Sequence, residues 1–190
     1  MTSHSKAEQE EEEESEVEIP TDSESDNDSG TEMTDEEVKK WLANIYERGS
    51  RKPMKEPLKA PLDIPISDAD VEKIKVGSRS RSMDDKWDLL VEDPDENGNV
   101  SLHIIRNWLQ DECYILHVVP KPSTEDGGSA KIERITWEGN KGGLQCDAEQ
   151  AKMEAVILCR MRLDCEFEAL PDYDISNLDN TKVYRKLDAK

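Results

Sequence analysis

Four residues with side chains suited to ligand binding lie close together in the sequence: Trp87, His103, Arg106 and Trp108. Arg106 continues the apolar positions of a predicted strand, so it places a cation on a face that is otherwise apolar. A guanidinium presents a rigid fork of N–H donors that matches a carboxylate or phosphate, and it also stacks on aromatic rings. These four residues are therefore the candidate ligand-binding site.

A structural interpretation of Arg106 stays open beside the functional one. In it, the guanidinium stacks on Trp87 or Trp108 and forms an ion pair with a nearby acid, the candidates being Asp84, Asp85 and Glu112. In the functional interpretation, the same fork binds a carboxylate or phosphate of a ligand.

Metal binding or nucleophilic catalysis would depend on His103, Cys113 and His117, which lie on neighbouring predicted strands. A three-residue turn between the strands would pair the two histidines, whereas a two-residue turn at Leu109–Gln110 would send them to opposite faces. The short spacings of a metal site are missing, and so are the glycine loops and nucleophile motifs of common enzyme families. The sequence favours a protein with no catalytic residues, no metal and no cofactor.

The segment Asp93-x-Asp95-x-Asn97-Gly98 matches the first half of a calcium-binding loop. Ile104 stands at the twelfth position, where that loop needs a bidentate glutamate, and the flanking residues have the pattern of strands. Because Asp, Asn and Gly are also the residues of tight turns, we predict a turn here, with a weak cation site as the alternative.

The charge is distributed unevenly along the chain. The net charge is −20, and residues 1–37 contain sixteen acids and one lysine. We predict that residues 1–33 are disordered, because their few apolar residues cannot offset the entropy of ordering. Acids three residues downstream of a hydroxyl suggest substrates of acidophilic kinases, and the candidate phosphorylation sites are Ser15, Thr21, Ser23, Ser25 and Ser29.

The same charge favours basic protein partners and opposes nonspecific binding to nucleic acid. No apolar run approaches the ~20 residues of a membrane-spanning helix, and the N-terminal residues have no pattern of a secretory or mitochondrial leader. The four cysteines form no paired framework. We therefore expect no membrane contact and an intracellular location, in the cytoplasm, the nucleus or both.

A capping box from Thr34 to Glu37 begins a predicted amphipathic helix over residues 34–49. One apolar stripe follows helical spacing, and its members are Val38, Trp41, Leu42, Ile45 and Tyr46. Either this stripe packs on the protein's own domain, or it binds a groove of a partner protein.

The remaining chain predicts an α+β fold. Residues 50–82 are predicted to form a connector. Its first part is rich in proline, which excludes helix and central strand. A short helix follows from Asp68 to about Lys75. Residues 83–170 form the domain, with strands at 87–92, 100–108, 112–119 and 130–138. A helix over 147–164 packs on this four-stranded antiparallel meander. Residues 171–190 are predicted as a polar tail.

The motifs around the candidate site resemble a family of small, mostly fungal proteins and a related bacterial module. The resemblance covers roughly Ser82 to Trp137. It rests on Met83-Asp84-Asp85-Lys86-Trp87 and on the following hairpin, in which His103-x-x-Arg106-x-Trp108 is similar to the family's H-x-x-R-S-W-T-G pattern. Asn107 replaces the serine, and Leu109–Gln110 replaces Thr-Gly. The bacterial module sometimes accompanies domains that handle ADP-ribose, so the resemblance implies a nucleotide-related ligand.

Two hypotheses follow. The first is a non-enzymatic interaction or regulatory module with an acidic leader. The alternative is a small domain that binds an anionic or nucleotide-related ligand through its Arg, His and Trp side chains.

Overall fold

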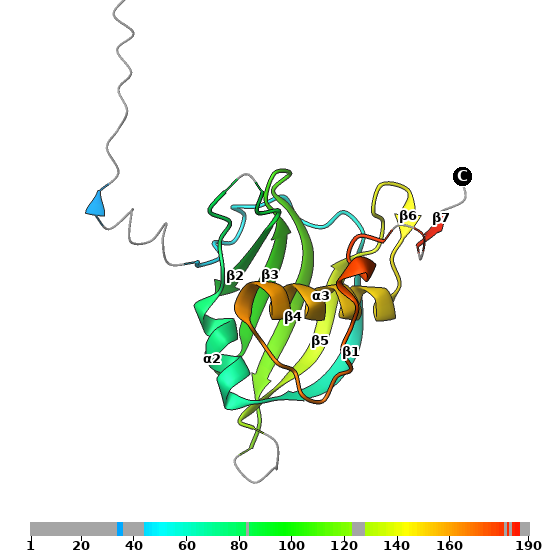
Figure 1. The fold of residues 1–190 in the computed structure, drawn as a ribbon. Coiled ribbons are helices and arrows are strands. Elements are labelled where there is room, and N and C mark those ends of the chain that lie inside the picture. The colour runs from blue at the N-terminus through cyan, green and yellow to red at the C-terminus, as the bar shows by residue number, and fades with distance from the viewer. Residues whose placement is uncertain are drawn as a thin grey trace, which may run out of the picture. The chain divides into compact units, whose positions relative to one another are not determined.

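The computed structural model describes residues 34–35, 44–82, 84–122, 128–180, 182 and 184–186 (Figure 1). The acidic leader with its five candidate phosphorylation sites lies outside these residues, as do Val38, Trp41 and Leu42 of the predicted amphipathic helix. No helix among the described residues has the length and apolar character needed to span a membrane.

Five antiparallel strands form the main sheet, in the order β1-β5-β4-β3-β2. Four of them follow one another as a meander: β2 (Trp87–Glu92), β3 (Val100–Arg106), β4 (Asp111–Pro120) and β5 (Ala130–Glu138). The fifth, β1 (Pro57–Ile66), pairs with β5 and forms an edge of the sheet. The predicted α+β class is confirmed, but the sheet has one strand more than predicted and β3 ends two residues earlier.

Two helices complete the fold, and Figure 1 shows α3 running across one face of the sheet. Helix α2 (Asp68–Val76) begins at the Ser67 cap, whose hydroxyl accepts from the Asp70 amide. Helix α3 (Ala148–Leu163) begins at Asp147, whose carboxylate accepts from the Gln150 amide at 2.9 Å. Both helices start where capping chemistry predicts, because a cap satisfies backbone donors that the first turn leaves unpaired.

The main core lies between α3 and the sheet. Alternate strand residues such as Leu89, Leu102 and Leu116 point into it and are fully or almost fully buried. Ala151 and Ala155 of α3 are also fully buried. Their small side chains leave room for the helix to lie close to the sheet.

The opposite face of the sheet also has buried residues, among them Leu90 and Ile105. Backbone pairing places the segment from Asn44 to Lys52 against this part of the sheet. The Tyr46 amide donates to the Val91 carbonyl at 2.7 Å, and the Glu112 amide donates to the Lys52 carbonyl at 3.0 Å. This segment therefore runs from the outer edge of β2 to the start of β4.

The predicted helix over residues 34–49 is wrong in its last turn. Ile45 forms a β-bridge with Val91, and Asn44 to Arg48 are not helical. The sheet explains this difference, because the free edge of β2 offers backbone partners and its second face needs apolar cover. Such tertiary contacts outweigh a local helical pattern.

The predicted connector over residues 50–82 is also wrong in part, because β1 lies within it. Pro57, Pro61 and Pro65 occupy one strand. A proline cannot donate to a strand partner, but an edge strand has donors that face away from the sheet, so prolines fit there. A bulge between Pro61 and Ile64 contains Asp63, which has a φ of 50°.

The polar tail predicted from residue 171 folds back on the domain. It contains the 3₁₀ helix η1 (Ile175–Asn177) and the short strand β7 (Arg185–Lys186), which pairs with β6 (Leu144–Gln145). We call residues 171–180, 182 and 184–186 the C-terminal strap.

Candidate functional site

A cavity of about 310 Å³ opens beside the first residue of β2 and the last residue of β3. Its lining combines an indole ring, cations, acids and a thiol, and includes Trp87, Arg106, Asp111, Cys113, Lys141 and Asp179. Two of the four residues predicted to bind a ligand, Trp87 and Arg106, therefore lie at one cavity.

Arg106 contributes the most directional hydrogen-bond donor group of this cavity. It pairs with Trp87 in the β2–β3 register, and its guanidinium carbon lies 4.7 Å from the centroid of the Trp87 ring. Nη1 donates to Oδ2 of Asp179 in the C-terminal strap at 2.7 Å. The structural interpretation correctly predicted the stack, but none of the three acids it proposed forms this ion pair. The guanidinium already holds a carboxylate delivered by another part of the chain.

A buried ionic cluster adjoins the cavity through Lys141, the member of the cluster that lines it. The Lys141 ammonium lies 2.8 Å from Oε2 of Glu154 and donates to the Tyr184 hydroxyl at 3.2 Å. The hydroxyls of Tyr114 and Tyr184 donate to Glu154, and so does the side-chain amide of Gln150. Burial alone would raise the pKa of Glu154, but Lys141 and the two tyrosine hydroxyls hold that pKa below its usual value. Glu154 is therefore an ionised carboxylate inside the fold.

Cys113 lies at the cavity because of a register shift. Ile104 faces Tyr114 and Ile105 faces Glu112, so Cys113 is the extra residue of a bulge in β4. Burial raises the pKa of the Cys113 thiol to about 11, although Lys141 and Arg106 oppose this shift. The thiol stays protonated near neutral pH, so it is a poor nucleophile.

His103, the third predicted ligand-binding residue, lies on the opposite face of the sheet. Its Nδ1 is 2.6 Å from Oε1 of Glu112, its Nε2 is 3.4 Å from Oε2 of Glu92, and its ring stacks on Tyr46 at 3.6 Å. Burial, followed by the Glu112 charge, raises the pKa of Tyr46 to about 12. This cluster fastens the segment from Asn44 to Lys52 to the sheet.

Trp108, the fourth predicted residue, lies in the turn from Asn107 to Gln110. Its side chain is 57% exposed and, with Ser80 and Arg81, lines a shallow hollow. Because β3 ends at Arg106, the alternation that would have placed Trp108 beside Trp87 stops before it. The structure thus brings together two of the four predicted residues.

The three metal-ligand candidates do not converge. His103 and His117 share the face opposite α3, but Cys113 lines the cavity described above. His117 Nε2 is 3.0 Å from the Thr136 hydroxyl, and burial, followed by the Arg134 charge, lowers its pKa to about 4. Within the described ranges, no group of three or more His, Cys, Asp and Glu side chains is arranged to hold a metal ion.

The predicted turn at Asp93–Gly98 is confirmed. Asp95 accepts from the backbone amides of Asn97 and Asn99, both at 2.9 Å, and from the Asn99 side chain at 2.8 Å. Its two carboxylate oxygens thus close the turn, and these hydrogen bonds lower the pKa of Asp95.

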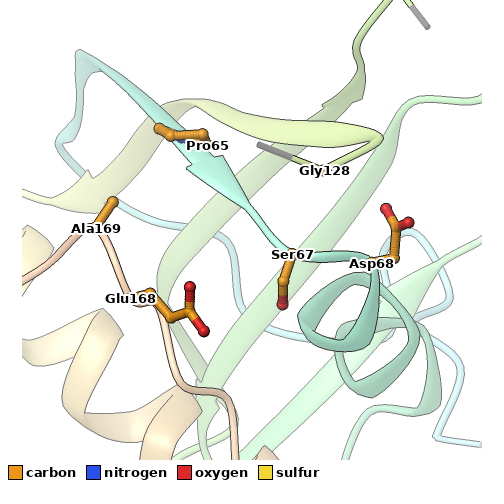
Figure 2. Close-up of a pocket in the computed structure, with 6 residues that line it drawn as sticks. All are labelled: Pro65, Ser67, Asp68, Gly128, Glu168 and Ala169. Carbon is orange, nitrogen blue, oxygen red and sulfur yellow. The ribbon is translucent and has the colours of Figure 1, made fainter. Parts of the chain in front are cut away.

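A wider hollow of about 620 Å³ lies between the start of α2 and the chain after α3 (Figure 2). Glu168 and Ser67 point toward it in Figure 2, whereas Asp68 points away. Asp68 accepts from the Ser129 amide at 2.8 Å, and Ser67 caps α2. The hydrogen bonds of Ser67 and Asp68 thus hold the chain in place, and the described residues that line the hollow include no cation.

No family model, no curated protein and no solved structure matches this chain. The resemblance to the small fungal family therefore stays a prediction.

Sequence reasoning missed Lys141, Glu154, Asp179 and Tyr184. One signal was present: Glu154 directly precedes Ala155 and lies three residues after Ala151, on the face of α3 that is otherwise small and apolar. A charged residue on a buried helical face requires a partner. The identity of that partner depends on tertiary contacts, because Lys141 lies in a loop and Tyr184 lies in the strap.

Proposed function

We propose that the protein is a non-enzymatic interaction module that binds a carboxylate-bearing segment at the cavity between Trp87 and Lys141. The observation that carries this proposal is the contact of Arg106 with Asp179, made while the guanidinium stacks on Trp87. An aspartate presented by a peptide chain already accepts from one nitrogen of the guanidinium, so the geometry suits a partner that presents the same group.

The chemistry of the lining supports an acidic segment as the ligand. Trp87 is buried, so the ring under Arg106 is held in place and fixes the orientation of the fork. Lys55 and Lys141 also line the cavity, but Asp111 and Glu138 line it too and offset their positive charge. The preference for a carboxylate therefore rests on Arg106, because a planar fork selects a carboxylate by geometry.

A binding role fits the lining better than catalysis does. The one thiol at the cavity, Cys113, has a raised pKa, and His103 and His117 lie on the other face of the sheet. Nucleophilic catalysis needs an activated nucleophile beside a base. The described residues that line the cavity do not place an activated nucleophile beside a base.

The remaining proposals concern the whole chain. The acidic leader in residues 1–33 is proposed as the segment that attracts basic protein partners, given its charge. The four cysteines are free, which supports a reducing compartment, the cytoplasm or the nucleus.

A second candidate function is binding of a small anionic ligand such as a nucleotide or sugar phosphate. The observation that favours it is the cavity volume of about 310 Å³. This volume falls at the lower end of small-ligand sites, which span roughly 300–1,000 Å³.

Calorimetric titration separates these candidates. Because Asp179 occupies the fork, the titrations use the full chain with Asp179→Asn. The probes are an amidated peptide with the sequence of residues 175–180, adenosine monophosphate and inorganic phosphate. Arg106→Ala and Arg106→Lys are each added to this background. The control is Arg134→Ala, which removes an exposed arginine paired with its neighbour Glu133.

We expect the peptide to bind, Arg106→Ala to abolish binding, Arg106→Lys to weaken it at least tenfold, and Arg134→Ala to leave it unchanged. Binding of adenosine monophosphate or phosphate without the peptide would replace the proposal with the small-ligand candidate. If no probe binds, or if the peptide binds equally well to the Arg106→Ala protein, the proposal is wrong.

A further inference from the structure

The C-terminal strap reaches the cavity through a series of side-chain-to-backbone contacts. Nη1 of Arg160 in α3 donates to the Pro171 carbonyl at 2.8 Å, and the Gln150 side chain donates to the Asn177 carbonyl at 3.2 Å. At its far end, β7 pairs with β6 through only two residues. Helix α3 thus guides the strap, but the pairing that ends it is short.

Asp179 is held in a backbone conformation that few residues adopt. Its φ is 56°, in the left-handed region, where aspartate is tolerated better than most residues other than glycine. Leu178, the preceding residue, is partly buried against the core. The strap therefore anchors one apolar side chain and turns sharply at the next residue, which directs a carboxylate to Arg106.

The contact between Asp179 and Arg106 is accessible to solvent. The side chains are 44% and 28% exposed. Ion pairs this exposed hold their partners only weakly, because water competes for both charges. A carboxylate from outside can therefore replace Asp179 without unfolding the domain.

Lys141 connects the cavity to the end of the strap. Its ammonium contacts the Tyr184 hydroxyl at 3.2 Å and lies 5.2 Å from the centroid of the Tyr184 ring. The same side chain lines the cavity. A ligand carboxylate that pairs with Lys141 thus weakens the contact between Lys141 and Tyr184. The strap then loses this contact in addition to the one that Asp179 makes.

From these contacts we infer that the C-terminal strap is a built-in competitor for the Arg106 site, so that an acidic partner segment binds by displacing Asp179. This inference rests on the proposed function, because it assumes that the site binds a carboxylate from a partner. It also specifies that partner: a segment in which an apolar residue precedes an aspartate, as Leu178 precedes Asp179.

The test compares the full chain with Asp179→Asn and with the control Asp172→Asn. The control removes the same charge from an exposed residue of the strap. The peptide of residues 175–180 is titrated into each protein by calorimetry. Hydrogen exchange of amides in residues 171–186 is measured by mass spectrometry with and without the peptide.

We expect Asp179→Asn to raise the affinity for the peptide by about two- to fivefold, the range that an exposed ion pair provides. Asp172→Asn should leave the affinity unchanged. In the unaltered protein the peptide should accelerate exchange in the strap, and Arg106→Ala should remove this acceleration.

Failure of the competitor and failure of the proposed function give different results. Equal affinities in the unaltered protein and Asp179→Asn, with no change in exchange, would overturn the competitor and leave the proposed function intact. Absence of binding to both proteins would overturn the proposed function, and the competitor with it. Equal gains in affinity from Asp179→Asn and Asp172→Asn would attribute the effect to net charge and also overturn the competitor.

Discussion

Replacing Lys141 with methionine should lower the free energy of unfolding by about 3 kcal/mol at pH 7. The Glu154 side chain has no exposed surface, and Lys141 is the cation nearest to it in the buried cluster. Removing one partner of a buried ion pair costs about 3–5 kcal/mol, because the other charge stays buried without compensation. Hydrogen bonds from Tyr114, Tyr184 and Gln150 remain, which favours the lower end of this range.

The free energy of unfolding that this substitution removes should depend on pH. In the unaltered protein the folded-state pKa of Glu154 lies below its ordinary value, so this residue stabilises the fold above that value and less as pH falls. Without Lys141, burial dominates and raises the folded-state pKa, so Glu154 takes up a proton at mildly acidic pH. The cost of the substitution should therefore be smaller at pH 4 than at pH 7.

Urea unfolding followed by tryptophan fluorescence at both pH values measures this difference. The control is Lys75→Met, which removes an exposed ion pair with Glu72 and should cost at most about 0.5 kcal/mol. A loss below about 1 kcal/mol at pH 7, or a loss of equal size at pH 4, would refute the account of the buried cluster.

Three further predictions concern the face of the sheet opposite α3. In an NMR titration the His117 ring should stay neutral down to about pH 5, because burial lowers its pKa to about 4; a midpoint near 6.5 would contradict this. Ile105→Ala should lower the free energy of unfolding by about 3 kcal/mol, as for other fully buried aliphatic residues, and a loss under about 1 kcal/mol in urea would show that the site is not tightly packed. Tyr46→Ala should cost at least about 1 kcal/mol through the lost stack on His103 and should speed hydrogen exchange at residues 44–52; unchanged exchange would mean that the stack does not hold this segment.

Local rules predicted the elements whose signals are contained in a few neighbouring residues. The meander followed from strand alternation, and the turn closed by Asp95 followed from turn chemistry. Helix α3 began and ended within a residue of the prediction, because Asp147 is a good N-cap and Asp164 adopts the left-handed conformation of a helix end.

Elements that depend on distant partners were not predictable in this way. The prolines of β1 argue against a central strand. They are compatible with an edge strand, but that strand forms only because β5 pairs with the segment. The segment from Asn44 to Lys52 has a helical pattern up to Tyr46, yet the edge of β2 pairs with it instead.

The candidate site also combines features that local sequence predicts with features that depend on distant partners. Strand alternation places Trp87 and Arg106 on one face and His103 on the other, so grouping His103 with Arg106 conflicted with a rule available from the sequence. The contact with Asp179 had no such signal, because 73 residues separate it from Arg106.

The position of β1 also sets an order of events during synthesis. Its partner residues, from Ala130 to Glu138, are translated only after β2, β3 and β4, which can already pair with one another. At about 5–20 residues per second, β1 waits for seconds beside the ribosome without its partner. A strand in this state is exposed to pairing with other nascent chains. Three prolines remove three backbone donors from β1, so they make such pairing less favourable until β5 arrives.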